Sequence, residues 1–169
     1  MLDVRYTEAD RRGRVGEQLA VIALLELVGY GDNRPRQLFE PHRLGEKSIA
    51  VDLFVDVLSS GGVCGLFAVQ VKTTTADVQA NGRLPISLKR VDVERHRPVV
   101  PTFVFGVHLP SGEIYVAQFP ASSDATVGTM PTSRRWSDPD TPLRLYECVR
   151  RFWDGVARPE NFEGFSYGD

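Results

Sequence analysis

The first hydrophobic pattern in the chain has the period of an α-helix. Thr7 is followed three residues later by Asp10, a spacing typical of a helix N-cap and its acidic partner. The pattern continues to about Val28, and Gly29 and Gly31 are expected to end the helix there. One apolar stripe is expected to face the core, and it consists of Val15, Leu19, Ile22 and Ala23, widened by Val21, Leu24, Leu25 and Val28.

The next strong pattern has a period of two and covers residues 49–74. It predicts two strands joined by a turn rich in Ser and Gly. The apolar face of this hairpin would consist of Val51, Leu53, Val55 and Val57 in the first strand and Phe67, Val69 and Val71 in the second. The opposite face would carry Asp52, Phe54, Asp56, Ala68, Gln70 and Lys72.

The length of the turn determines how the two strands pair. A five-residue turn over residues 59–63 places Leu58 opposite Cys64. Antiparallel pairing then places Asp52 directly opposite Gln70, with side chains roughly 5 Å apart. A carboxylate, an amide and the ammonium of Lys72 would therefore share one small area of the sheet.

Weaker signals surround this hairpin. Residues 37–39 are predicted to form a weak edge strand, followed by a loop that reaches residue 45. Residues 84–88 alternate as in a short strand, and Pro85 restricts that strand to a sheet edge. Residues 89–97 favour a short, charged helix or turn.

The C-terminal part begins with a second hairpin. Residues 102–109 and 113–119 alternate around a Pro-Ser-Gly turn. Residues 120–142 lack periodicity and are expected to form a long loop, and residues 143–156 predict a final amphipathic helix. The tail, residues 158–169, either docks on the domain or stays loose, and its docking residues would be Phe162, Phe165 and Tyr167.

This order of elements predicts an α/β fold, with a mixed central sheet flanked by helices. A chain of 169 residues is long enough for one hydrophobic core. We therefore expect one domain over residues 1–157, with residues 158–169 as its tail.

Composition excludes few functions. The chain is 42% hydrophobic and 25% charged, as soluble globular proteins are. It has no apolar run of about 18–20 residues and does not open with a signal peptide, so we expect no membrane association. Its two cysteines, Cys64 and Cys148, lack metal-ligand spacing and fit the reducing conditions of the cytoplasm.

Charge leaves a nucleic-acid partner open. The net charge is −2, but local clusters matter more than the total. Arginines gather at residues 11–14, 90–97, 134–135 and 150–151. Each cluster alone is most simply a solvated surface, so the clusters do not establish the partner.

The polar face of the first hairpin carries the chemistry of phosphodiester hydrolysis. That reaction needs a divalent cation held by oxygen ligands, together with a group that orients water or stabilises negative charge. Asp52 and Gln70 can supply the oxygens, and Lys72 can supply the positive charge. Glu17, on the preceding helix beside Gly16, would add a second carboxylate.

These residues occur in the order of a known motif. A helix with Glu17, a strand with Ala50-Val51-Asp52 and a strand with Val69-Gln70-Val71-Lys72-Thr73-Thr74 resemble the PD-(D/E)xK nuclease superfamily. The match spans about residues 11–119 and is similar to uncharacterised bacterial members that carry Gln in place of the second acid. The resemblance implies the restriction-endonuclease-like αβββαβ core, here with an added C-terminal helix.

The resemblance also implies residue roles. Asp52, Gln70 and Glu17 would be ligands of Mg²⁺ or Mn²⁺, and Lys72 would act on the attacking water. DNA would be the substrate, in phage defence, DNA repair or a mobile element. The residues expected to contact nucleic acid are Arg11, Arg12, Arg14, Thr73, Thr74, Arg90 and Arg95.

Two other interpretations stay open. The neutral Gln70 also suits a catalytically inactive subunit that binds nucleic acid or a protein partner, or forms a homodimer. Asp52 and Lys72 could instead form a structural ion pair.

Other candidate ligands are weaker. Asp56 shares a strand face with Asp52, but it would lie more than about 10 Å from the site. His42, His96 and His108 have no ligand spacing; we expect His108 in a strand and the other two exposed, with His96 a possible phosphate contact.

Overall fold

The computed structural model describes residues 7–30, 34–44, 51–88, 100–120, 128–155, 162 and 165. In chain order the elements are α1 (Glu8–Leu25), β1 (Leu27–Tyr30), β2 (Arg34–Gln37), β3 (Phe39–Arg43), β4 (Leu53–Ser59), β5 (Gly62–Thr74), β6 (Arg83–Pro85), β7 (Thr102–His108), β8 (Glu113–Gln118), β9 (Thr129–Pro131) and α3 (Asp140–Trp153). The fold is therefore α/β, as the sequence predicts.

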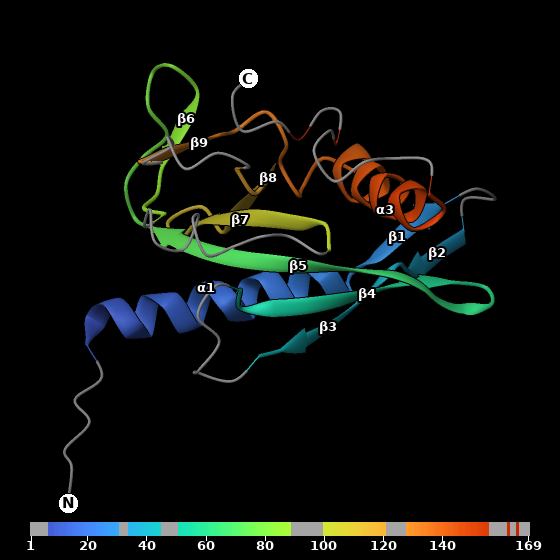
Figure 1. Ribbon diagram of the computed structural model, residues 1–169. Helices are drawn as coiled ribbons and strands as arrows, with labels where there is room; N and C mark the ends of the chain where they lie inside the picture. Colours follow the sequence, from blue (N-terminus) through green and yellow to red (C-terminus); the bar gives the residue numbers. More distant parts are fainter. Residues whose placement is uncertain are drawn as a thin grey trace, which may run out of the picture.

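Five strands form the central sheet, in the order β3-β4-β5-β7-β8 (Figure 1). β5 and β7 run parallel, whereas the other neighbouring pairs are antiparallel. The predicted mixed sheet is thus confirmed. Two further pairs, β1-β2 and β6-β9, form small antiparallel sheets of their own.

α1 and α3 pack against the same face of the central sheet, which we call the helix face. Apolar residues of all five strands meet the two helices there. The helix residues of this core are Ala20, Ala23, Leu24, Leu145, Tyr146 and Val149. Phe67 joins two neighbouring rings edge to face, with its centroid 5.6 Å from that of Phe39 and 5.7 Å from that of Phe103. Burial of each such ring stabilises the fold by roughly 1.5–3 kcal/mol.

The opposite face of the sheet is partly covered by the small sheet β6-β9, and we call it the β6-β9 face. Leu84 and Met130 of the small sheet occupy the space above Gly106, where any side chain would collide with them. Gln70 pairs with Val104, and Lys72 pairs with Gly106, in the parallel ladder between β5 and β7. Because successive strand residues alternate between faces, Gln70 and Lys72 belong to the β6-β9 face.

The start of α1 is the predicted one. The backbone N–H of Asp10 donates to Thr7 Oγ1 at 3.2 Å, and the backbone N–H of Thr7 donates to the Asp10 carboxylate at 2.8 Å. This reciprocal pair satisfies donors that the first turn of a helix leaves without partners. The Thr7 hydroxyl and then its backbone N–H hold the pKa of Asp10 below its usual 3.8.

Replacing Thr7 with alanine is expected to lower the free energy of unfolding by about 0.5–2 kcal/mol, because the N-cap hydrogen bond is lost. A carboxyl group with a lowered pKa in the folded state stabilises the fold above its unfolded pKa, and this contribution is lost as the pH falls. The difference in free energy of unfolding between Thr7→Ala and wild type should therefore be largest at neutral pH. It should decrease as the pH falls through the lowered pKa of Asp10. Urea unfolding of Thr7→Ala across pH measures this, with Thr75→Ala, an exposed threonine outside the elements, as control. Equal effects of the two substitutions would contradict the capping role.

The predicted end of the first helix is wrong, and the predicted stripe is confirmed only in part: Ala23 and Leu24 are buried, and Leu19 and Val21 pack against the core. The helix ends at Leu25, because residues Leu27–Tyr30 pair with β2 as a strand. The residues it buries are Gly16, Ala20, Ala23 and Leu24, whereas Val15 and Ile22 are 43% and 57% exposed. The reason is close packing: small residues let the helix approach the sheet, and the larger residues are turned outward.

The central hairpin keeps the predicted register at the end that carries Asp52 and Gln70. Leu53 pairs with Val69, and the backbone N–H of Asp52 donates to Val69 O at 2.8 Å. The turn differs, because a bulge between Val57 and Leu58 pairs Leu58 with Val63 rather than with Cys64. The register shifts by one residue only beyond the bulge, so Asp52 still lies opposite Gln70.

The other strands refine the predictions. The weak edge strand is two strands, β2 and β3, and the expected loop after residue 39 is largely β3. Pro41 fits there because β3 is an edge of the central sheet. The short strand before Ile86 is β6, which pairs with β9 inside the predicted long loop. The hairpin of β7 and β8 is confirmed, and residues 89–97 lie outside the described part.

The C-terminal region adds to the core. The final helix begins at Asp140, three residues earlier than predicted, and ends at Trp153. Phe162 and Phe165 are buried against Phe103, so of the two alternatives for the tail these residues dock, and Tyr167 lies outside the described residues. Neither described helix is long and apolar enough to cross a membrane.

Candidate functional site

Asp52 and Gln70 meet at the point where β4 begins. The Gln70 amide Nε2 donates to Asp52 Oδ2 at 2.5 Å, and the Val71 backbone N–H donates to the same oxygen at 2.6 Å. β4 starts at Leu53, one residue after Asp52. The Asp52 carboxylate, and not a backbone carbonyl of β4, therefore accepts the hydrogen bond from the Val71 N–H of β5. The predicted contact between these two residues is therefore present, and it holds the carboxylate in a fixed orientation.

The orientation of Gln70 leaves its carbonyl oxygen available. The second interaction of the amide Nε2 is with Val71 O at 3.4 Å. Both hydrogen bonds of the amide are thus made by Nε2, whereas Gln70 Oε1 accepts no hydrogen bond from the described residues. Gln70 itself is buried, with 6% of its surface exposed, so its position is set by packing.

Lys72 lies two residues beyond Gln70 on the same face of β5 and is half-buried. Its ammonium makes neither an ion pair nor a hydrogen bond with the described residues. The structural ion pair between Asp52 and Lys72 that the sequence allowed is therefore absent. A half-buried lysine without a counter-ion leaves its donors available to a ligand.

The donor set fits a hard divalent cation in part. Mg²⁺ is commonly held by one or two carboxylates together with waters and substrate phosphates. Asp52 provides one carboxylate, and Gln70 Oε1 provides a neutral oxygen beside it. The described residues contain no cluster of three His, Cys, Asp or Glu side chains that would form a cage. The residues fit an open site that needs water and substrate to complete it.

Glu17 lies beside the site strand without contacting the other site residues. Gly16, the residue before it, packs directly on the side chain of Thr73, which follows Lys72 in β5. Glu17 is half-buried and forms no hydrogen bond or ion pair with any described residue. Its role as a metal ligand therefore stays a prediction.

The contact between α1 and β5 can be tested by paired glycine substitutions. An alanine methyl at Gly16 would lie 3.1 Å from Thr73 Cβ and 3.2 Å from Thr73 Cγ2, and closer still to its hydroxyl. We expect Gly16→Ala to destabilise the protein by about 1–3 kcal/mol, because the helix must move away from the strand. Gly13 has open space around its Cα, so Gly13→Ala should stabilise the helix by up to about 1 kcal/mol. Urea unfolding compares the two, and shifts in the same direction would contradict the described contact.

Asp56 has a different partner. His42 Nε2 lies 3.0 Å from Asp56 Oδ2, and Asp56 pairs with Leu66 rather than with Gln70. Four residues of strand separate Asp56 from Asp52, which is more than about 10 Å. The structure therefore supports the choice of Asp52 over Asp56.

The predicted nucleic-acid contacts are scattered. Thr73 faces α1, on the side of the sheet opposite to Lys72, because it packs on Gly16. Thr74 belongs to the same face as Lys72, and its Oγ1 accepts from the Ala76 N–H at 3.1 Å. Arg90 and Arg95 lie outside the described residues.

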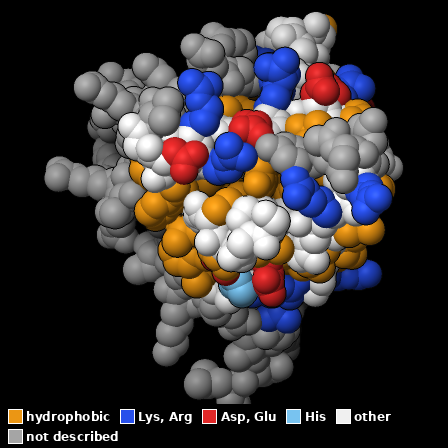
Figure 2. All heavy atoms as spheres, turned by 90° about the vertical axis from the view of Figure 1, so that its right-hand side faces the viewer, with side chains coloured by type: hydrophobic (Ala, Val, Ile, Leu, Met, Phe, Trp, Pro, Cys, Tyr) orange, Lys and Arg blue, Asp and Glu red, His pale blue; other side chains and the backbone are white. Residues whose placement is uncertain are grey.

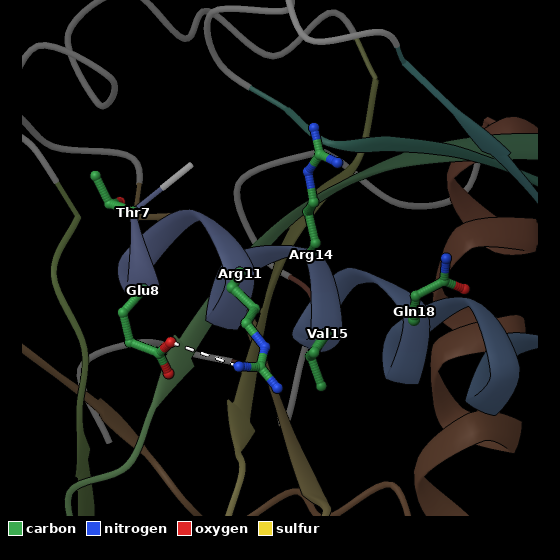
Figure 3. Close-up of a pocket in the computed structure, with 6 residues that line it drawn as sticks. All are labelled: Thr7, Glu8, Arg11, Arg14, Val15 and Gln18. Atoms are coloured by element: carbon green, nitrogen blue, oxygen red, sulfur yellow. Dashed lines mark ion pairs between the residues drawn. The ribbon is translucent and has the colours of Figure 1, made fainter. Parts of the chain in front are cut away.

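The arginines of α1 line a separate hollow. It has a volume of about 490 Å³, and its described lining consists of Thr7, Glu8, Arg11, Arg14, Val15 and Gln18 (Figure 3). Glu8 binds Arg11 at 3.9 Å and Arg12 at 3.2 Å, which reduces the positive charge available there. The lining side chains are on the part of the helix opposite to Gly16 and Ala20, so the hollow does not include Asp52 or Lys72.

Positive charge is also dispersed at the end of the molecule where the β4–β5 hairpin turns. Figure 2 shows Lys and Arg side chains interspersed with acidic and hydrophobic ones on this face, without a continuous basic surface. The chain as a whole has a net charge of −2. On this face, therefore, the described residues offer a nucleic-acid phosphate single cations and no continuous basic surface.

Sequence reasoning missed two features of the site. The Val71 N–H that fixes Asp52 is a backbone group and has no signal in the side-chain pattern. His108 is in a strand, as predicted, but its burial on the β6-β9 face beside Thr74 follows from the parallel pairing of β5 and β7. That pairing joins strands far apart in the sequence. His42 is exposed as expected, and His96 lies outside the described residues.

Comparisons with protein-family models, with curated proteins and with solved structures find no match for this chain. The arrangement of Asp52, Gln70 and Lys72 must therefore be interpreted from its own chemistry.

Proposed function

We propose that this protein is a metal-dependent phosphodiesterase that cleaves DNA, with a reaction centre formed by Asp52, Gln70 and Lys72. One observation carries the proposal: a carboxylate fixed by two N–H donors lies against an amide whose oxygen is uncommitted, two residues from an unpaired lysine. Each element of this arrangement has a use in phosphodiester hydrolysis.

Asp52 and Gln70 would hold Mg²⁺ or Mn²⁺ through a carboxylate oxygen and Gln70 Oε1. When bound, the cation would polarise a phosphoryl oxygen and lower the pKa of coordinated water. The hydrogen bonds from Gln70 and Val71 keep Asp52 in position before any ligand arrives. Such preorganisation avoids the cost of ordering the carboxylate during the reaction.

Lys72 would act on the reacting groups. In hydrolysis a water oxygen adds to phosphorus, the bond from phosphorus to one sugar oxygen breaks, and the leaving oxygen takes a proton. The Lys72 ammonium can orient the water or donate to the phosphoryl oxygens as their negative charge increases. Its donors have no protein partner among the described residues, so a substrate would not have to displace one.

Glu17 is carried on the helix face of the sheet, opposite to Gln70 and Lys72, so it would act on this centre by orienting water at the edge of the sheet. It is carried by a helix that packs on β5 through Gly16 and Thr73, so the helix and the site strand are fixed relative to each other. Its carboxylate has no partner of its own among the described residues. A water-mediated contact suits a group that is held near a site without contacting it.

The restriction-endonuclease-like core is part of the same proposal. α1, the strands β3, β4 and β5, and then β7 follow the αβββαβ order, if the second helix falls within residues 89–97, outside the described part. α3 would be the addition to this core. The mixed sheet and its parallel pair β5 and β7 support this assignment.

A second function is favoured by one observation. The Gln70 amide donates to Asp52 at 2.5 Å, and this bond satisfies the carboxylate without a cation. A chain in which that bond is permanent would be a catalytically inactive subunit that binds a nucleic acid or a protein. The two functions differ in whether Asp52 also binds a metal.

Purified protein incubated with linear, supercoiled and single-stranded DNA tests the proposal. We expect cleavage with Mg²⁺ or Mn²⁺ and none with EDTA. Asp56→Asn is the matched control for Asp52→Asn, because Asp56 is a carboxylate of the same strand with a different partner. Loss of cleavage in Asp52→Asn alone supports the assignment, whereas no metal-dependent cleavage by wild type under any of these conditions contradicts it.

A further inference from the structure

His108 occupies the end of β7 on the β6-β9 face. It pairs with Thr74 of β5 in the parallel ladder and with Glu113 of β8 in the antiparallel one. The same ladder pairs Lys72 with Gly106, two residues before His108. With a rise of about 3.3 Å per residue and strands about 4.8 Å apart, the backbone of His108 lies roughly 8 Å from that of Lys72.

A short hydrogen-bond chain runs from His108 through Ser111 to the backbone of Glu113. His108 Nδ1 lies 2.7 Å from Ser111 Oγ, and the Glu113 backbone N–H donates to the same oxygen at 3.2 Å. The Ser111 hydroxyl has one hydrogen to donate, and His108 Nδ1 lies within its reach at 2.7 Å. This arrangement favours Nδ1 as acceptor and places the ring proton on Nε2.

The other ring nitrogen of His108, Nε2, is buried beside an exposed carboxylate. His108 has 8% of its surface exposed, and Nε2 is fully buried without a hydrogen-bond partner among the described residues. Asp77 Oδ1 is 3.7 Å away, beyond hydrogen-bond distance, and the Asp77 side chain is 97% exposed. A buried donor without a partner destabilises the free protein, so a ligand that supplies an acceptor is favoured there.

We propose that His108 Nε2 donates a hydrogen bond to a phosphate of the nucleic-acid substrate, next to the phosphate on which Lys72 acts. This assignment rests on the proposed phosphodiesterase function and names a contact for the same substrate. Asp77 would turn away, because its exposed side chain is not held by a hydrogen bond to the imidazole. A phosphate oxygen would then accept from Nε2.

The position also suits an extended substrate. His108 and Thr74 are at the carboxyl ends of the two parallel strands, where ligands of α/β sheets commonly bind. Leu84 and Met130 fill the space above Gly106, so a backbone that passes Lys72 would follow β5 towards Thr74 before it reaches His108. The contact would position the substrate and would not take part in bond breaking.

The wild-type protein provides the first test. Histidine ring resonances are recorded by NMR while a short DNA oligonucleotide is added in EDTA, which prevents cleavage. We expect the His108 ring nitrogens to shift and those of His42, which is 52% exposed and bound to Asp56, to stay unchanged. A His108 signal that responds to neither single- nor double-stranded DNA overturns the assignment. The same result is expected if a water molecule permanently occupies Nε2, and it overturns the assignment in that case too.

Variants provide the second test. His108→Gln should weaken oligonucleotide binding in EDTA about five- to tenfold and raise KM with little change in kcat, whereas His42→Gln should change neither. Unfolding curves show whether the His108→Gln variant is folded. If this variant does not fold, the NMR titration of the wild-type protein decides the proposal. Metal-dependent cleavage without a His108 response overturns the His108 contact alone. A His108 response without cleavage supports the phosphate contact and contradicts hydrolysis, and the absence of both overturns both.

Discussion

Replacing Lys72 with alanine is expected to reduce metal-dependent DNA cleavage by at least about 100-fold. Loss of a single preorganised donor to developing negative charge typically lowers kcat by about 10²–10³. The fold should be unaffected, because the Lys72 ammonium forms no ion pair with the described residues. Initial cleavage rates of purified Lys72→Ala and wild type, at saturating Mg²⁺ and equal protein concentration, measure the effect.

Two comparisons make this result specific. Lys72→Arg keeps the charge but changes the donor geometry, so we expect an intermediate rate. Asp56→Asn changes a charge on the neighbouring strand and should leave the rate unchanged, because Asp56 is bound to His42. If Lys72→Ala cleaves as fast as wild type, the cleavage comes from another site or another protein.

Replacing Gln70 with glutamate is expected to make folding depend on metal. In wild type the Gln70 Nε2 donates to Asp52 Oδ2 at 2.5 Å; a carboxylate there would remove the donor and place two negative charges together. Without metal we expect the free energy of unfolding to fall by at least about 2 kcal/mol, or roughly 4–8 °C in Tm. A divalent cation between the two carboxylates should reverse this loss and raise metal affinity above that of wild type.

Thermal unfolding with EDTA, Mg²⁺ and Mn²⁺ measures this effect for Gln70→Glu and for Gln18→Glu. Gln18 is an exposed residue of α1, so its substitution introduces the same charge change away from Asp52. Gln18→Glu should show little response to metal. An equally small response of Gln70→Glu would indicate that Asp52 and Gln70 are not adjacent metal ligands.

The contact between Asp52 and Gln70 could be predicted because it depends on local pattern. Alternation of apolar residues in residues 49–74 indicates two strands, and the Ser-Gly turn brings them together. The bulge at Val57 changed the strand register only for the pairs near the turn. The wrong turn length therefore did not alter the predicted pairing of Asp52 with Gln70.

Features that depend on distant parts of the chain could not be predicted in this way. The helical stripe was assigned from hydrophobicity, yet Gly16 faces the sheet, because its position is determined by contact with Thr73. β9 pairs with β6 across more than 40 residues of sequence, as the register of Arg83 with Pro131 shows. Local periodicity carries no information about such partners.

The same limit applies to the chemistry of the site. Residue type indicated that Asp52 and Lys72 could serve a phosphodiesterase, but it also allowed an ion pair between them, which the structure does not contain. The role of Gln70 as donor to Asp52 depends on the orientation of its amide, which no sequence pattern specifies. The free Oε1 and the unpaired Nε2 of His108 are likewise properties of the folded chain.

The most direct test of the proposed site is a crystal structure of the protein soaked in Mn²⁺ and then in Mg²⁺. We expect one ion bonded to a carboxylate oxygen of Asp52 and to Gln70 Oε1, with a bond of about 2.0–2.1 Å when the ion is Mg²⁺. The anomalous signal of Mn²⁺ identifies the position. Crystals that contain no ion at Asp52 at saturating Mn²⁺, with Gln70 Nε2 still donating to Asp52 Oδ2, would contradict the metal site and the proposed function.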